Sequence, residues 1–113
     1  MPGDRSVTIE LDVFSGRPNP SWEPGPPEQA KLLQLLRSND VVAGRPEAPP
    51  GLGYRGFIVK IGSNAEEDVL RVGGGAIERQ GKYYRDEGRA VEKYLIQIMP
   101  DGLRSQFRTI LPQ

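Results

Sequence analysis

The chain has 113 residues, with 15 lysines and arginines against 15 aspartates and glutamates, 14 glycines, 11 prolines, and neither histidine nor cysteine. The missing residue types exclude a Ser-His-Asp triad, a cysteine nucleophile, and imidazole or thiolate ligands for zinc or haem. Zero formal charge argues against general binding of nucleic acid or of anionic membranes, because both draw on a net basic field.

The length fits a single domain spanning residues 1–113. The N-terminal segment lacks the pattern of a signal peptide, and no apolar run approaches the roughly 18 residues of a membrane span. We therefore expect a cytoplasmic protein. We also expect that it needs no cofactor and no metal.

The first predicted element is a strand over 7–13, because apolar and polar side chains alternate through this segment. Glu10 and Asp12 share its polar face, where we expect them to face solvent or to pair with arginines. The strand leads into an ordered, turn-rich loop, since Pro18 and Pro20 remove backbone donors and restrict the residues before them. The apolar face of the strand holds Val7, Ile9, Leu11 and Val13.

A helix is predicted over 26–38. Leucines recur there at helical spacing, prolines occupy its first positions, and Glu28 lies near its positive N-terminal end. The segment 39–53 that follows is rich in proline and glycine. A loop of roughly 15 residues in a small domain is usually functional or mobile.

Two further strands are predicted in the middle of the chain. The segment 54–61 places Phe57, Val59 and Ile61 on one face and Ile58 on the other, which indicates an interior strand. A third strand is predicted over 68–72.

Turn signals surround these strands. The segments 76–80 and 82–85 predict a hairpin with a type II′ turn at Gly81-Lys82. The glycines at 73–75 are interpreted as joining strands, because no phosphate-binding motif surrounds them. The acids at 66–68 lack the ligand spacing of an EF-hand loop and are interpreted as a solvated turn.

The chain ends in two predicted helices. Asp86 suits the N-cap of the first, which ends at Met99-Pro100, and Asp101 can cap a short final helix. Strands in the middle with helices on either side predict an α+β fold, a mostly antiparallel sheet of about four to five strands with helices packed on one face.

The loop after the first strand has the densest set of groups suited to recognition. Arg17 supplies a planar donor fork, Asn19 a donor and an acceptor, and Trp22 a flat apolar surface with one N–H. Two prolines would hold these groups in place, and pre-ordering lowers the entropic cost of binding. The alternative is structural: Asn19 caps backbone groups, and Trp22 fills the core beside the first helix.

A second candidate lies at 52–57, where Gly53 and Gly56 would let a ligand or another backbone approach closely. Arg55 would join the recognition surface there, unless it pairs with an acid while Tyr54 enters the core. The PxxP spacings, such as Pro24 to Pro27, suit ligands of aromatic grooves, although loop prolines more often limit loop freedom.

The two segments Leu11-Asp12-Val13-Phe14-Ser15-Gly16-Arg17-Pro18-Asn19-Pro20 with Trp22, and Leu52-Gly53-Tyr54-Arg55-Gly56-Phe57, resemble a group of small bacterial proteins with a similar layout. The resemblance covers most of the chain. No activity is established for that group, so the resemblance implies neither a function nor a catalytic residue.

The function expected from the sequence is a non-enzymatic binding or protein-interaction module that uses Arg17, Asn19, Trp22 and Arg55. Its partner would be a protein or a small anionic ligand, not nucleic acid or a membrane. One alternative is a small enzyme, of isomerase or cyclase type, that uses Asp, Tyr and Arg for proton transfer and anion stabilisation. A homodimer through Tyr83-Tyr84 or the late helices is another.

Overall fold

The chain forms a sheet and three helices in a computed structural model, which describes residues 6–13, 18–37, 41–42, 56–63, 66–109 and 111. The elements in chain order are β1 (Ser6–Leu11), β2 (Ser21–Trp22), α1 (Pro26–Leu36), β3 (Val41–Val42), β4 (Phe57–Ser63), β5 (Glu66–Gly73), β6 (Ala76–Arg79), β7 (Lys82–Arg85), the 3-10 turn η1 (Glu87–Arg89), α2 (Ala90–Ile98) and α3 (Asp101–Gln106).

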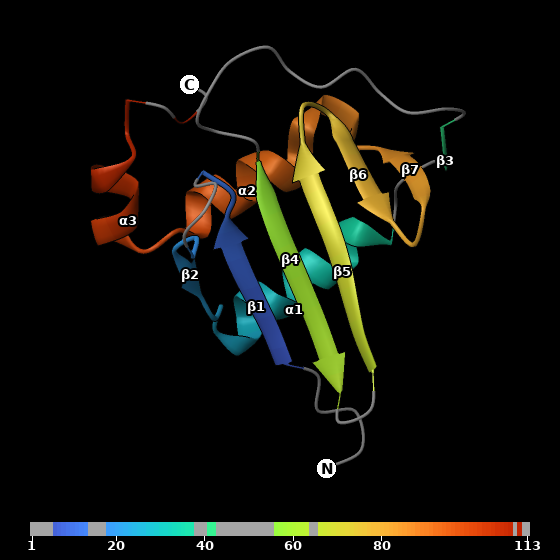
Figure 1. Cartoon of the computed structure of the whole chain (residues 1–113), viewed down its shortest axis with the longest axis horizontal. Helices are drawn as coiled ribbons and strands as arrows, with labels where there is room; N and C mark the ends of the chain where they lie inside the picture. Colours follow the sequence, from blue (N-terminus) through green and yellow to red (C-terminus); the bar gives the residue numbers. More distant parts are fainter. Residues whose placement is uncertain are drawn as a thin grey trace.

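The sheet is antiparallel, with the strand order β2-β1-β4-β5-β6-β7-β3. Helices α1 and α2 lie behind the sheet in the view of Figure 1, so the predicted α+β class is confirmed. The five longer strands match the predicted number. The edge strands β2 and β3 have two residues each and are not predicted by the sequence pattern.

Strand β4 lies in the interior of the sheet, between β1 and β5, as its apolar residues on both faces predict. Phe57 lies between Leu11 of β1 and Val72 of β5, so the apolar faces of the three strands coincide. Leu32 of α1 and Leu95 of α2 are fully buried against this layer. The other buried apolar residues that the strands place on the helix-covered face are Val7, Ile9, Val59, Ile61, Leu70 and Ile77.

The hairpin between β6 and β7 is confirmed, but its predicted turn is wrong. Arg79 pairs with Lys82, which leaves Gln80 and Gly81 as the two loop residues. Both have positive φ, 52° and 78°, as a type I′ turn requires, and this turn suits the right-handed twist of paired strands. The predicted turn therefore lies one residue too late in the chain.

The β5–β6 connection confirms that the glycine run joins strands. Gly73 pairs with Ala76, and Gly74 and Gly75 form the turn with φ of 62° and 84°. The predicted solvated turn at 66–68 is wrong, because Glu66 pairs with Ser63 and the acids extend β5.

The first helix and the later helical segment each begin at identifiable residues. Pro26 and Pro27 form the first turn of α1 while Pro24 is buried, so this PxxP spacing serves the helix start. The backbone N–H of Gly25 donates to Glu28 Oε1 at 3.0 Å. The helix predicted from Asp86 begins instead with the η1 turn, in which Gly88 has a φ of 62°. No helix in the described part of the chain is long and apolar enough to cross a membrane.

Candidate functional site

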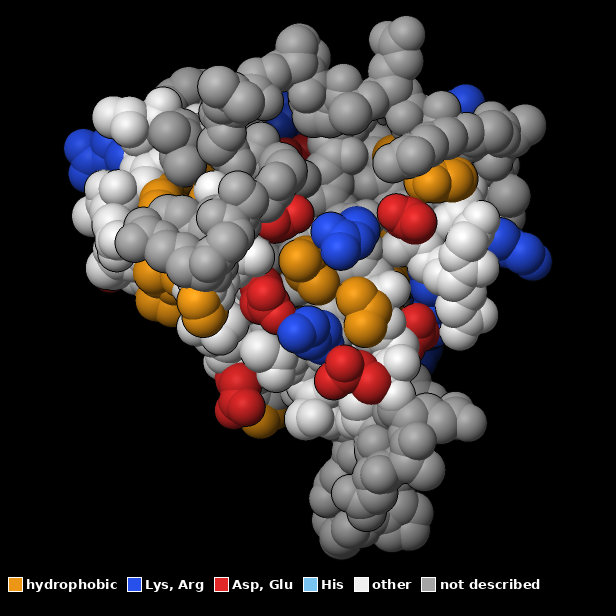
Figure 2. Space-filling model, in the orientation of Figure 1, with side chains coloured by type: hydrophobic (Ala, Val, Ile, Leu, Met, Phe, Trp, Pro, Cys, Tyr) orange, Lys and Arg blue, Asp and Glu red, His pale blue; other side chains and the backbone are white. Residues whose placement is uncertain are grey.

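Among the residues that the structure describes, no helix lies on one face of the sheet, and alternate residues of the strands point to that face. Glu10 Oε2 of β1 lies 2.5 Å from Lys60 Nζ of β4, and Asp12 Oδ2 lies 3.5 Å from Arg71 Nη1 of β5. Asp12 thus pairs with an arginine as predicted, whereas the partner of Glu10 is a lysine. Figure 2 shows this face, on which two small apolar areas lie among acidic and basic side chains.

The apolar residues of the uncovered face are Ile58 and Val69. Ile58 is 9% exposed and lies opposite both Glu10 and Arg71 in the strand register. Val69 lies opposite Lys60 and is 40% exposed, the large hydrophobic residue that the described part of the chain leaves most open. Because neighbouring β-strands lie about 4.8 Å apart, these side chains form one small patch.

Asn19 anchors the proline-rich loop to the end of β1. Its Oδ1 accepts a hydrogen bond from the backbone N–H of Val13 at 3.1 Å, and its Nδ2 lies 3.5 Å from Asp12 Oδ1. The N–H of Leu11 donates to the carbonyl of Pro20 at 2.9 Å. Asn19 therefore has the backbone-capping role of the structural alternative, and through Asp12 it adjoins Arg71 on the uncovered face.

Trp22 belongs to the helix-covered side of the sheet. It pairs with Ile9, and its ring meets that of Phe57 edge to face, with centroids 6.2 Å apart and planes at 84°. Its Nε1 is buried and has no hydrogen-bond partner among the described residues. Asn19 and Trp22 thus engage different sides of the sheet and do not form one surface.

The two sequence motifs meet at a hydrogen bond, because the N–H of Asp12 donates to the carbonyl of Gly56 at 3.0 Å. Arg17 and Arg55, the other two predicted binding residues, lie outside the described residues, as does Tyr54. Their predicted roles stay predictions.

Gly56 fulfils the close approach predicted for it, and the neighbour is another backbone. Its φ is 104°, and a Cβ at this position would lie 2.1 Å from the carbonyl oxygen of Val72. Only glycine fits there without movement of β5.

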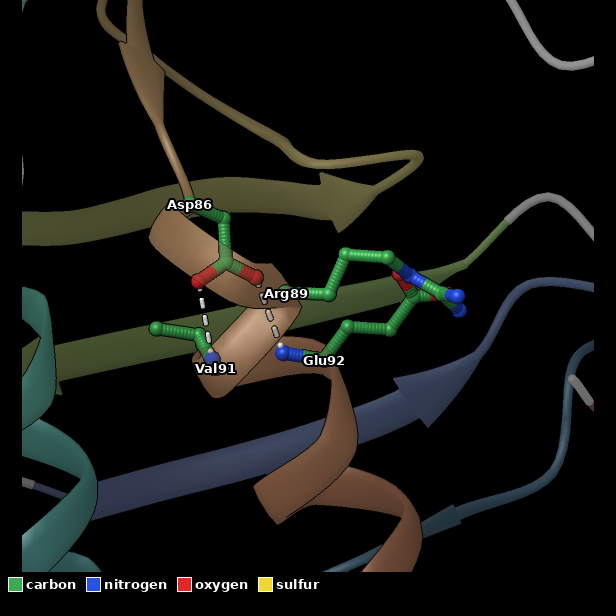
Figure 3. Close-up of polar contacts among 4 residues, drawn as sticks. All are labelled: Asp86, Arg89, Val91 and Glu92. Atoms are coloured by element: carbon green, nitrogen blue, oxygen red, sulfur yellow. Dashed lines mark hydrogen bonds and ion pairs between the residues drawn. The ribbon is translucent and has the colours of Figure 1, made fainter. Parts of the chain in front are cut away.

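A polar cluster at the start of α2 was only partly predicted. The carboxylate of Asp86, 2% exposed, accepts hydrogen bonds from the backbone N–H groups of Val91 and Glu92, at 2.8 and 3.0 Å (Figure 3). Arg89 Nε donates to Glu92 Oε1 at 3.0 Å, and Glu92 is 1% exposed. Asp86 was expected as a cap, whereas the buried acid Glu92 was missed. Its spacing of three residues from Arg89 is the signal that could have found it.

The three buried acids of the described residues, Asp12, Asp86 and Glu92, lie toward one end of the sheet. Asp12 bonds to Gly56, and the N–H of Asp86 donates to the carbonyl of Gly75 in the β5–β6 turn. Each carboxylate already engages an arginine or two backbone donors. No group of acids within the described ranges is arranged to hold a metal ion.

Comparison of the chain with protein-family models, with curated proteins and with solved structures finds no match. The function must therefore be argued from the geometry.

Proposed function

We propose that this protein is a cytoplasmic, non-enzymatic interaction module that contacts a protein partner with the uncovered face of its sheet. One observation carries the proposal. In the described part of the chain, α1 and α2 cover a single face, and the opposite face leaves Val69 40% exposed among the ion pairs Glu10–Lys60 and Asp12–Arg71. An apolar contact framed by polar groups is typical of interaction surfaces.

The anchored loop supports the same proposal. Asn19 ties the loop to Asp12, so the loop begins and ends beside the uncovered face. A partner on this face would meet Asn19 already held beside Asp12, which lowers the ordering entropy that binding costs at this residue. The partner-binding roles of Arg17 and Arg55 belong to this proposal.

The enzymatic alternative has weaker support from the geometry. An acid and an arginine do meet at Asp12 and Arg71, as that alternative requires. They pair with each other, and the side chain of Arg71 is 60% exposed on the open face. General acid–base chemistry instead needs a group poised towards a bound substrate.

The proposal is tested by selecting peptides from a displayed library on the immobilised full chain. We expect selected peptides to lose affinity for Val69→Asp and to keep it for Gln34→Asp, which places the same charge at an exposed position of α1. Val69→Thr, a milder change that suits a strand, should weaken the same peptides to a lesser extent. Equal affinity for all of these variants, or the selection of no peptide, would show that the proposal is wrong.

A further inference from the structure

The first half of β5 is paired on one side only. On that side β4 pairs with β5 along the range 66–72. On the other side β6 pairs only with the range 70–73, and the chain turns back at Gln80 and Gly81. Figure 1 shows the start of β5 extending past the end of β6. Within the described part of the chain, the segment Glu66–Val69 therefore has one side without a strand, which we call the open edge.

The backbone groups of Glu67 and Val69 point to the open edge. Gly73 and Ala76 close a two-residue turn between β5 and β6, so their N–H and C=O groups face each other. This direction alternates along a strand, so Glu67 and Val69 share the orientation of Gly73, whereas Asp68 faces β4. Because β6 ends before it reaches Glu67, no strand in the described ranges pairs with the N–H and C=O of that residue on this side.

The side chains of the same two residues are also exposed. Both belong to the uncovered face, and Val69 is 40% exposed. Val69 lies opposite Lys60 of β4, but β6 pairs with no residue of β5 before Leu70. An exposed apolar side chain and an unpaired stretch of strand backbone thus lie together, and an added strand would cover both.

A second copy of this chain does not suit the open edge. Two-fold antiparallel pairing about Glu67 would place this acid directly opposite its own copy, and like charges in that position destabilise a strand pair. Pairing about Asp68 would place Glu67 of each copy opposite the apolar Val69 of the other. Pairing about Val69 would need the position beside Leu70, which β6 already occupies. A strand with a different sequence avoids all three conflicts.

We propose that an extended segment of another protein adds to the open edge as an antiparallel strand, with a β-branched or aromatic side chain opposite Val69 and no acid opposite Glu67. Another extended backbone is the partner that satisfies unpaired strand N–H and C=O groups. The antiparallel direction matches every strand pair of this sheet. This inference rests on the proposed function, in which Val69 contacts the partner, and it names the conformation in which that partner binds.

Amide hydrogen exchange of the full chain, followed by NMR, tests the main-chain pairing. The probe is a peptide selected from the displayed library that loses affinity for Val69→Asp. In the free protein we expect the N–H of Glu67 to exchange quickly and that of Asp68, which faces β4, to exchange slowly. The bound peptide should slow the exchange at Glu67 by roughly ten-fold or more. Exchange at Gly102, in the exposed first turn of α3, should stay unchanged.

Two variants of Glu67 separate the backbone from the side chain. Glu67→Pro removes the N–H that points to the open edge and keeps the pairing with β4, a position where strands tolerate proline. It should weaken the same peptide by roughly ten-fold. Glu67→Gln is the matched control, because it keeps the N–H and the side-chain shape, and its affinity should stay within about two-fold. The exchange measurement uses the natural chain, so it decides the matter even where Glu67→Pro does not fold.

The possible results distinguish this inference from the proposed function. A peptide that depends on Val69 but leaves the exchange at Glu67 unchanged, or binds Glu67→Pro as tightly as Glu67→Gln, would overturn strand addition and leave the interaction face standing. Peptides insensitive to Val69→Asp, or a library that yields none, would overturn both.

Discussion

The backbone N–H of Asp86 donates to the carbonyl oxygen of Gly75 at 2.9 Å, and this contact fastens the β5–β6 turn to the start of α2. The carboxylate of the same residue accepts the N–H groups of Val91 and Glu92, which the first turn of a helix leaves without partners. One buried residue thus connects the sheet, through its backbone, to the helix that covers it, through its side chain.

Asp86→Ala should destabilise the protein by about 2 kcal/mol, because it removes a helix cap and leaves two buried N–H groups unsatisfied. For a domain of this size the melting temperature should fall by roughly 8 °C. The control is Asp101→Ala in the first turn of α3, where the carboxylate is fully exposed and the cost should stay below about 0.5 kcal/mol. Equal losses in thermal unfolding would contradict the capping role.

Gly56→Ala should cost about 3 kcal/mol or more. The new Cβ would lie 2.1 Å from the carbonyl oxygen of Val72, and the backbone φ of 104° is strained for any other residue. Gly102→Ala is the matched control, since its Cβ meets no atom within 4 Å in α3. There we expect a gain of roughly 0.5 kcal/mol from helix propensity. Urea denaturation of both variants checks the prediction, and a tolerated alanine at Gly56 would contradict it.

The faces of the long strands could be predicted from the sequence because side-chain direction in a strand has a period of two. Val7 and Ile9 are buried as their alternation predicts, and the same rule puts Val69 on the face opposite Leu70. That the face of Val69 is uncovered could not be predicted, since this depends on where α1 and α2 pack. Strands as short as Ser21–Trp22 could not be predicted either, because two residues are too few to show the alternation of a strand.

The candidate site was predicted only in part. Asn19 was singled out as a binding residue, and the described contacts of its side chain join it to Asp12 and Val13 at the end of β1. A sequence shows which polar groups are present but not which of them form hydrogen bonds within the fold. Glu92 was missed for the opposite reason: its position in α2 looks like an ordinary polar residue until Arg89 and the sheet enclose it.

Trp22→Phe should cost only about 1 kcal/mol. The substitution keeps an aromatic ring against Phe57 and removes an indole N–H that is buried without a hydrogen-bond partner among the described residues. Phe57→Ala should cost about 3 to 5 kcal/mol, since Phe57 is 1% exposed at the centre of the core. Unfolding must be followed by circular dichroism and not by tryptophan fluorescence, because Trp22 is the only tryptophan. A loss at Trp22→Phe as large as that at Phe57→Ala would contradict this reading of the indole.

The ion pair on the uncovered face predicts a change in stability at alkaline pH. The hydrogen bond with Glu10 raises the pKa of Lys60 above 10.5, and the charges of Glu10 and Glu67 act in the same direction against the effect of burial. Below pH 10.5 Lys60 is protonated in both the folded and the unfolded chain, so its stabilising contribution is fully present. As the pH rises from there through the folded-state pKa, this contribution is lost.

Lys60→Met should therefore be less stable than the natural chain near neutral pH, and the difference should shrink above about pH 10.5. The effect should be small and weakened by salt, because the Lys60 side chain is 37% exposed. Urea midpoints between about pH 8 and about pH 11.5 measure it, with Lys93→Met on the exposed side of α2 as the control. A difference between Lys60→Met and the natural chain that stays constant or grows across this range would contradict the coupling to Glu10.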